Sequence, residues 1–153
     1  MRKFKFGLIC FVLLGTAHVC IAQHDWKMER TIGFSCNGSR SAALPKIEKL
    51  LISESPSEIG KLIYSENIVE QYFGIFYLKI SETKISNIIS KTEKERIDEL
   101  FDLNEKVGFC AGCKRGNQTT LKEIFEGASQ HILYSTKDWF NKTLKNAKYG
   151  LAD

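Results

Sequence analysis

The residues of this sequence best suited to chemistry are cysteines. Cys110 and Cys113 form a C-x-x-C pair and are followed directly by Lys114 and Arg115. Two thiols at this spacing can close a small disulfide ring, and the adjacent positive charges favour the thiolate form. The pair is therefore a candidate centre for thiol–disulfide exchange.

A structural role for these cysteines competes with the redox interpretation. No βαβ pattern surrounds the pair, and the two prolines, Pro45 and Pro56, lie far upstream of it. A bond from Cys36 to Cys110 would close a loop of about 74 residues and contribute about 4 kcal/mol in the chain-entropy model. A Cys110–Cys113 ring would restrain far less chain. We therefore expect a disulfide from Cys36 to Cys110 or Cys113, and the sequence does not decide between these two partners.

A zinc site is the third possibility for the same cysteines. A closed structural zinc site needs four ligands, and a C-x-x-C pair supplies two of them. His24 or His131 could add another, but no second half with matching spacing is present. His131 precedes Ile132 and Leu133 and is expected to be an ordinary, partly buried histidine. The sequence therefore predicts neither a metal ligand set nor a cofactor.

No other motif indicates catalysis. Acidic and basic residues interleave between Lys91 and Glu99, which is typical of a solvated helix face with small ion pairs. Serine, histidine and aspartate occur without a nucleophile-elbow motif. Three glycosylation sequons begin at Asn37, Asn117 and Asn141, and the sequence does not show whether they are used. We assign no catalytic residue.

The first 22 residues have the layout of a cleaved secretory signal peptide. Three basic residues precede an apolar run, and small residues end at Ala22. The apolar run is short for a membrane span, so an uncleaved anchor is the weaker alternative. A lipoprotein modified at Cys20 is another, although His18 and Val19 fit lipoprotein processing badly. We expect a periplasmic or extracellular protein.

Cleavage would change the charge of the chain. Three of the 22 basic residues lie in residues 1–22, so 19 would remain against 18 acidic ones. A nucleic-acid-binding protein needs a basic surplus concentrated on one face, and a net charge of about +1 does not provide it. No second apolar span follows. The exported chain would keep Cys36, Cys110 and Cys113 as its cysteines.

The remaining sequence predicts an all-α fold made of short antiparallel helix pairs. Residues 23–43 read as an irregular N-terminal arm, and residues 44–153 as one α-helical domain. Helix start signals recur at Pro45, Ser55, Ser65, Ser81, Ser90, Thr120, and Ser135 or Thr136. No period-two alternation extends over six residues, so we expect no strands except a short extended piece over residues 31–35.

Residues 55–80 resemble a HEAT-type helical hairpin. Ile59–Ile63 forms a first apolar stripe, and the turn Ser65–Asn67 leads to a second stripe over Val69–Leu78. A weaker echo covers residues 83–106, but the usual proline and arginine landmarks and a clean repeat period are missing. The resemblance implies stacked helix pairs, whose usual role is to bind another macromolecule. An irregular helical bundle explains the pattern almost as well.

Together these observations favour an exported, non-catalytic protein–protein interaction module stapled by one disulfide. An inhibitor or immunity-type protein would be one form of it. Its protein partner and its oligomeric state cannot be read from the sequence. The alternative is a thiol–disulfide redox or zinc-binding protein that uses Cys110 and Cys113.

Overall fold

The structure is a computed structural model that describes residues 29–36, 38–53, 56–83, 88–112, 114–115, 118–127 and 129–149. The expected signal peptide, residues 1–22, and Cys113 lie outside these ranges. In chain order the elements are β1 (Thr31–Cys36), α2 (Leu44–Ile52), the 3-10 helix η1 (Pro56–Tyr64), α3 (Ile68–Glu82), α4 (Lys91–Asp102), β2 (Lys106–Gly112), β3 (Lys114–Arg115), β4 (Thr119–Thr120), α5 (Leu121–Phe125) and α6 (Gln130–Tyr149). None of the helices in these ranges is both long enough and apolar enough to span a bilayer.

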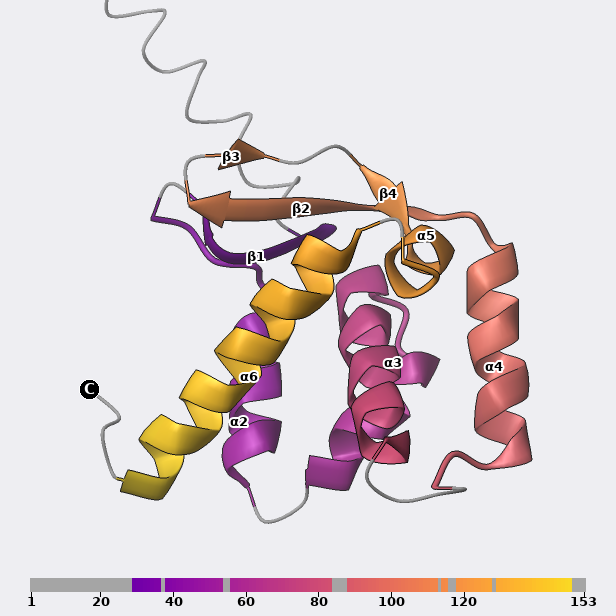
Figure 1. Ribbon diagram of the computed structural model, residues 1–153, viewed down its shortest axis with the longest axis horizontal. Coiled ribbons are helices and arrows are strands. Elements are labelled where there is room, and N and C mark those ends of the chain that lie inside the picture. The colour runs from indigo at the N-terminus through magenta and orange to yellow at the C-terminus, as the bar shows by residue number, and fades with distance from the viewer. Residues whose placement is uncertain are drawn as a thin grey trace, which may run out of the picture.

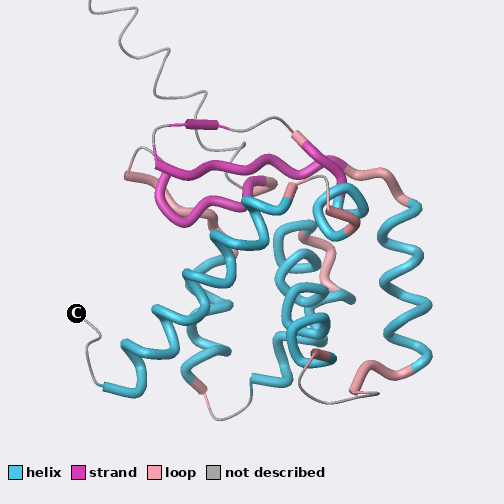
Figure 2. Tube along the Cα trace, in the orientation of Figure 1, coloured by secondary structure: helices cyan, strands magenta, loops and turns pink. Residues whose placement is uncertain are grey.

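The prediction of an all-α fold with an irregular N-terminal arm is wrong, because the helices pack beneath a small mixed sheet (Figure 1). β1 lies in the expected arm and pairs in parallel with β2, which in turn pairs antiparallel with β3 and β4. Figure 2 shows the strands gathered at one end of a mostly helical molecule. The sheet thus joins the beginning of the described chain to its second half.

The β1–β2 pair is close because of a glycine. Thr31 lies opposite Gly108, and Ile32 lies opposite Phe109. A Cβ atom at Gly108 would lie 2.9 Å from the Thr31 hydroxyl oxygen, so a larger residue would require the Thr31 side chain to move. Glycines such as Gly33 and Gly108 also interrupt the alternation of apolar side chains. This interruption explains why no period-two pattern is visible in the sequence.

The centre of the core is α3, which lies between α4 on one side and α2 and α6 on the other (Figure 1). Its buried residues are Ile68, Val69, Gln71, Tyr72, Phe73, Gly74, Ile75, Phe76 and Leu78. Aromatic rings connect it to α6, with ring centroids 5.5 Å apart for Phe73 and Trp139 and 5.2 Å apart for Phe76 and Phe140. A helix buried on nearly every side needs such neighbours around it.

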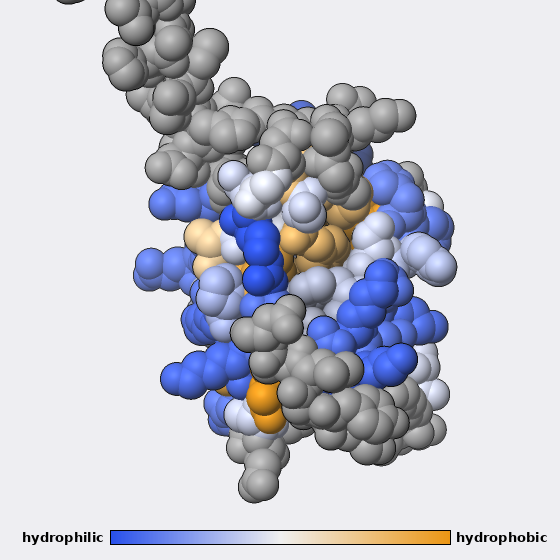
Figure 3. Space-filling model, turned by 90° about the vertical axis from the view of Figure 1, so that its left-hand side faces the viewer, coloured by the Kyte–Doolittle hydropathy of each residue, from blue (hydrophilic) through white to orange (hydrophobic). Residues whose placement is uncertain are grey.

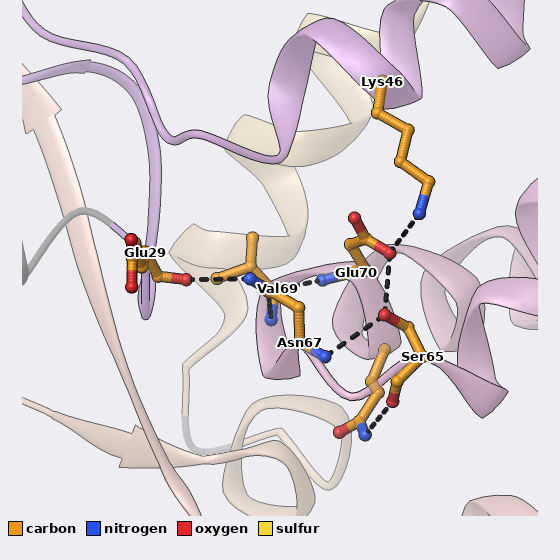
Figure 4. Close-up of polar contacts among 7 residues, drawn as sticks. Glu29, Lys46, Ser65, Asn67, Val69 and Glu70 are labelled. Atoms are coloured by element: carbon orange, nitrogen blue, oxygen red, sulfur yellow. Dashed lines mark hydrogen bonds and ion pairs between the residues drawn. The ribbon is translucent and has the colours of Figure 1, made fainter.

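Asn67 begins α3 and ties it to the chain around it (Figure 4). Its side-chain oxygen accepts hydrogen bonds from the backbone N–H groups of Val69 at 2.9 Å and Glu70 at 3.3 Å, which makes it the N-cap. Its amide nitrogen donates to the carbonyl of Glu29 at 3.4 Å. The Glu70 carboxylate also lies 2.5 Å from the ammonium of Lys46 on α2. The start of the central helix is therefore fixed by two other segments.

Several predicted helix starts are confirmed. α2 begins next to Pro45, and α3 begins after the predicted Ser65–Asn67 turn. Ser90 and Thr120 form capping boxes at the beginnings of α4 and α5. Gly127, just beyond α5, has a positive φ of 105°, a conformation that commonly follows the end of a helix.

Other predicted boundaries are wrong. Ser81 does not begin a helix, because α3 continues to Glu82. Neither Ser135 nor Thr136 is a cap, because α6 begins at Gln130 and both residues lie inside it. The helix expected after Ser55 is a 3-10 helix. Residues 106–112 and 114–115, where no strand was expected, form β2 and β3.

η1 and α3 pack against each other in the helix–turn–helix order expected for residues 55–80. The contact is closest at Gly74, where a Cβ atom would lie 2.6 Å from the backbone nitrogen of Ile63. This close approach is the reason for a glycine inside a buried helix. The described residues give no support for a repeated HEAT-type unit, since the helices beside this pair differ in length and type.

Candidate functional site

The predicted disulfide lies between two strands of the sheet. Cys36 at the end of β1 and Cys110 in β2 form a disulfide with an S–S distance of 2.03 Å and a Cα–Cα distance of 5.6 Å. Both residues are almost fully buried, with relative exposures of 1% and 0%. The bond closes a loop of 74 residues that contains α2, η1, α3 and α4. In the structure it therefore ties the N-terminal strand to the remainder of the sheet.

This bond engages one member of the C-x-x-C pair. Cys110 is bonded to Cys36, and Cys113 lies outside the described residues. The part of the chain that the structure describes holds no group of three His, Cys, Asp or Glu side chains that could bind a metal ion. His24 is outside that part as well. His131 is exposed, and its ring meets the Phe109 ring edge-on at 5.3 Å.

A buried hydroxyl pair lies in the core. The Tyr72 and Thr136 hydroxyl oxygens are 2.5 Å apart, and the Thr136 hydroxyl donates to the Ile132 carbonyl at 2.8 Å. Tyr72 is therefore the donor in the Tyr72–Thr136 bond. Burial raises the pKa of Tyr72 well above its ordinary value of 10.0. The pair is neutral and fully buried, so it serves the packing of α3 against α6.

Glu123 is an acidic residue with a shifted pKa, and its role is local. Its carboxylate accepts hydrogen bonds from the Thr120 backbone N–H at 2.8 Å and from the Thr119 hydroxyl at 2.9 Å. These bonds, the backbone one first, lower the pKa of Glu123. They are the capping interactions that begin α5. An exposed carboxylate held in this way is not poised to act as a general acid.

A polar hollow of about 290 Å³ lies where α3 begins. It is lined by Glu29, Arg30, Glu66, Asn67, Ile68 and Glu105. Arg30 is ion-paired with Glu105, and Asn67 caps α3. These side chains are therefore engaged in holding the fold, and we assign no function to this hollow.

The strongest candidate is a groove of about 370 Å³ between α3 and α6, with Phe125 of α5 also in its lining. We call it the α3–α6 groove, and its residues are Phe76, Lys79, Ile80, Thr83, Phe125, Gln130, Leu133, Tyr134 and Lys137. Four of them belong to α3 or its C-cap and four to α6, each set at positions i, i+3, i+4 and i+7. Such spacing places the members of a set on one face of a helix. Two helix faces thus form the walls.

The floor of the α3–α6 groove is apolar and its rim is polar. Phe76 is buried, and Ile80, Phe125 and Leu133 are half-buried. Lysines, Thr83 and Gln130 surround this floor, and Tyr134 stands at the rim with 76% of its surface exposed. An open apolar hollow with a few polar groups around it is the usual form of a binding site.

A second exposed apolar area has no such shape. Figure 3 shows apolar residues gathered near the middle of one face, among hydrophilic ones. This face carries α2 and α6 in Figure 1. Some exposed apolar surface is ordinary on folded proteins. We assign no site to this face.

Sequence reasoning missed the α3–α6 groove. It placed the aromatic residues from Tyr72 to Tyr77 in the core, which is correct for Tyr72, Phe73 and Phe76. The only signal for the groove was the i, i+3, i+4, i+7 spacing in two separate helices, and this spacing also describes an ordinary buried stripe. That the two faces meet in space is visible only in the fold.

The chain was also compared with known proteins. No protein-family model, no curated protein and no solved structure matches it. The geometry of the disulfide and of the α3–α6 groove is therefore the ground for a functional proposal.

Proposed function

We propose that this chain is an exported, non-catalytic protein-binding module that docks a partner protein in the α3–α6 groove. The observation that carries the proposal is the groove itself, an apolar floor open to solvent between two helix faces. Tyr134 adds a large exposed ring at its rim. Tyrosines in such positions often dominate binding energy at protein interfaces.

Export is supported by the chemistry of the cysteines and by the sequence of the first 22 residues. A buried disulfide between β1 and β2 persists most readily in an oxidising compartment, such as the periplasm or the extracellular space. The expected signal peptide would direct the chain there. An inhibitor or immunity-type protein, which blocks its partner by occupying a surface, is one form that this function would take.

The alternative function gains no support from the described residues. A thiol–disulfide or zinc centre at Cys110 and Cys113 requires a free Cys110, and this residue is bonded to Cys36. Such a function would require the buried bond to open first. We therefore keep the binding function as the conclusion.

The test compares two tyrosine variants in a partner-capture experiment. Tyr134→Ala removes the ring at the groove, and Tyr64→Ala removes a ring that is 53% exposed and lies outside the groove. We expect immobilised wild type and Tyr64→Ala to retain the same protein from the native secreted or envelope fraction. Tyr134→Ala should lose it, because truncating an interface hot spot costs about 2 kcal/mol, roughly thirtyfold in affinity. Equal retention by Tyr134→Ala would refute docking in the groove.

A further inference from the structure

We infer that the partner segment bound in the α3–α6 groove is acidic, with a large apolar side chain on the groove floor and carboxylates beside Lys79 and Lys137. This inference rests on the proposed function and adds the chemistry of the partner. The charged side chains that line the groove are all positive. None of the nine groove residues is acidic, whereas two are lysines.

The two lysines carry positive charge that the described chain leaves without an ion pair. Lys79 lies on the α3 wall and Lys137 on the α6 wall. Neither forms an ion pair with any residue in the described ranges.

The acidic residues nearest to these lysines in sequence are engaged elsewhere. Glu82, one turn after Lys79, lies 3.6 Å from the ammonium of Lys94. Asp138, next to Lys137, lies 2.7 Å from the ammonium of Lys142. Neither of these two carboxylates therefore pairs with a groove lysine, and an incoming carboxylate meets two cations that form no ion pair with the described residues.

Lys79 is also held in place. Its ammonium nitrogen lies 6.0 Å from the ring centroid of Phe101 and 5.9 Å from that of Phe125. Those two rings are stacked on each other with centroids 6.0 Å apart. A cation near aromatic faces is attracted to them, which positions the charge beside Phe125 in the lining of the groove. A lysine side chain that is already held in position loses less conformational entropy when it binds a carboxylate.

The groove has room for a short segment. The seven residue steps from Phe76 in α3 to its C-cap Thr83 rise roughly 10 Å at about 1.5 Å per residue. A volume of about 370 Å³ holds one or two large side chains. A segment that pairs an apolar anchor with nearby aspartate or glutamate matches both the floor and the rim, whereas a basic segment would meet like charges.

The experiment selects binders without assuming their charge. A random-sequence peptide library on phage is panned against the folded full chain, and the enriched peptides are sequenced. We expect a large apolar residue with aspartate or glutamate within a few positions. Binding should weaken on the order of fivefold for Lys79→Glu and for Lys137→Glu, and more for the double variant. Lys145→Glu changes the net charge equally outside the groove and should leave binding unchanged.

Two further measurements separate the possible failures. Lys79→Met removes the charge but keeps the length of the side chain, so it covers the case in which Lys79→Glu does not fold. Binding of the enriched peptides to Tyr134→Ala shows whether they use the groove. Enriched peptides that need Tyr134 but are neutral or basic would overturn the acidic inference and leave the proposed function standing. Peptides that bind Tyr134→Ala as well as wild type, or a library that enriches nothing, would overturn both.

Discussion

The hydroxyls of Tyr72 and Thr136 form a buried pair with defined direction. Thr136 donates to the Ile132 carbonyl and accepts from Tyr72, so each hydroxyl hydrogen has an acceptor. Neighbouring residues are apolar, including Phe73 and Phe76, whose rings flank Tyr72. A buried donor without an acceptor costs more than a lost hydrogen bond. Removing the Tyr72 hydroxyl and removing the Thr136 hydroxyl should therefore lower the stability of the fold by different amounts.

We predict that Thr136→Val destabilises the fold more than Tyr72→Phe. Tyr72→Phe keeps the ring and loses one hydrogen bond, which costs about 1 kcal/mol. Thr136→Val leaves the Tyr72 hydroxyl buried without an acceptor and costs about 1 to 3 kcal/mol. Urea unfolding of the two variants measures the difference. The double variant should be no less stable than Thr136→Val, and a ranking with Tyr72→Phe as the less stable single variant would contradict the bonding direction.

The same tyrosine predicts a dependence on alkaline pH. Burial raises the pKa of Tyr72 in the folded chain, so the unfolded chain loses this proton first as pH rises above about 10. The stability that the buried, neutral Tyr72 contributes is complete below the pKa of this group in the unfolded chain. Above that pKa the free energy of unfolding falls with increasing pH, at about 1.4 kcal/mol per pH unit. Unfolding of wild type and Tyr72→Phe at several alkaline pH values tests this, because the variant lacks this contribution. Parallel pH profiles of the two proteins would contradict it.

At the scale of elements, the contact between η1 and α3 depends on Gly74. Replacing a helical glycine with alanine normally gains about 1 kcal/mol. Here the added Cβ would lie 2.6 Å from a backbone nitrogen of η1, which cannot move without shifting the helix. The steric clash of the added Cβ therefore opposes the gain in helix propensity and outweighs it.

We predict that Gly74→Ala destabilises the chain by about 1 to 3 kcal/mol, the usual cost of overpacking. Gly60→Ala is the matched control, since its Cβ would meet only side chains, with the Leu78 methyl nearest at 3.0 Å. Gly60→Ala should lower the free energy of unfolding clearly less than Gly74→Ala does. Thermal and urea unfolding measure both variants, and a Gly74→Ala protein more stable than wild type would exclude the close contact.

Helices with local start signals and the extended piece over residues 31–35 could be predicted from the sequence, whereas β2 and the pairing of the strands could not. The capping boxes at Ser90 and Thr120 are complete within four residues, so they are readable without the fold. β1 and β2 become strands by pairing with each other across most of the chain. The start of α6 was misplaced because Thr136, which was interpreted as a cap, bonds the Ile132 carbonyl from inside the helix. The α3–α6 groove needed the spatial arrangement of two helices.

At the scale of the whole molecule, the Cys36–Cys110 bond constrains the unfolded chain. We predict that Cys36→Ala combined with Cys110→Ala lowers the free energy of unfolding by about 4 kcal/mol, as expected for a loop of this length. Urea unfolding of the oxidised wild type and the double variant tests this. Wild type treated with a reductant should approach the variant. A variant as stable as oxidised wild type would show that the bond contributes nothing.

The disulfide also predicts a pattern in peptide mapping. Unreduced protein should yield a cross-linked peptide that contains Cys36 and Cys110. Mass spectrometry after thiol blocking checks this directly. A ring between Cys110 and Cys113 would contradict the structure and make the C-x-x-C loop the functional centre instead of the α3–α6 groove.

The parallel pairing of β1 with β2 has a consequence for the order of folding. β1 is synthesised first among the described elements, but its partner strand follows only after α2, η1, α3 and α4. η1 and α3 are neighbours in sequence and can pack early, whereas a distant strand pair must first overcome the entropy of closing the intervening chain. The sheet therefore forms late. Until the sheet forms, Cys36 remains a free thiol. Oxidation before synthesis or folding is complete would therefore pair Cys36 with a thiol other than Cys110.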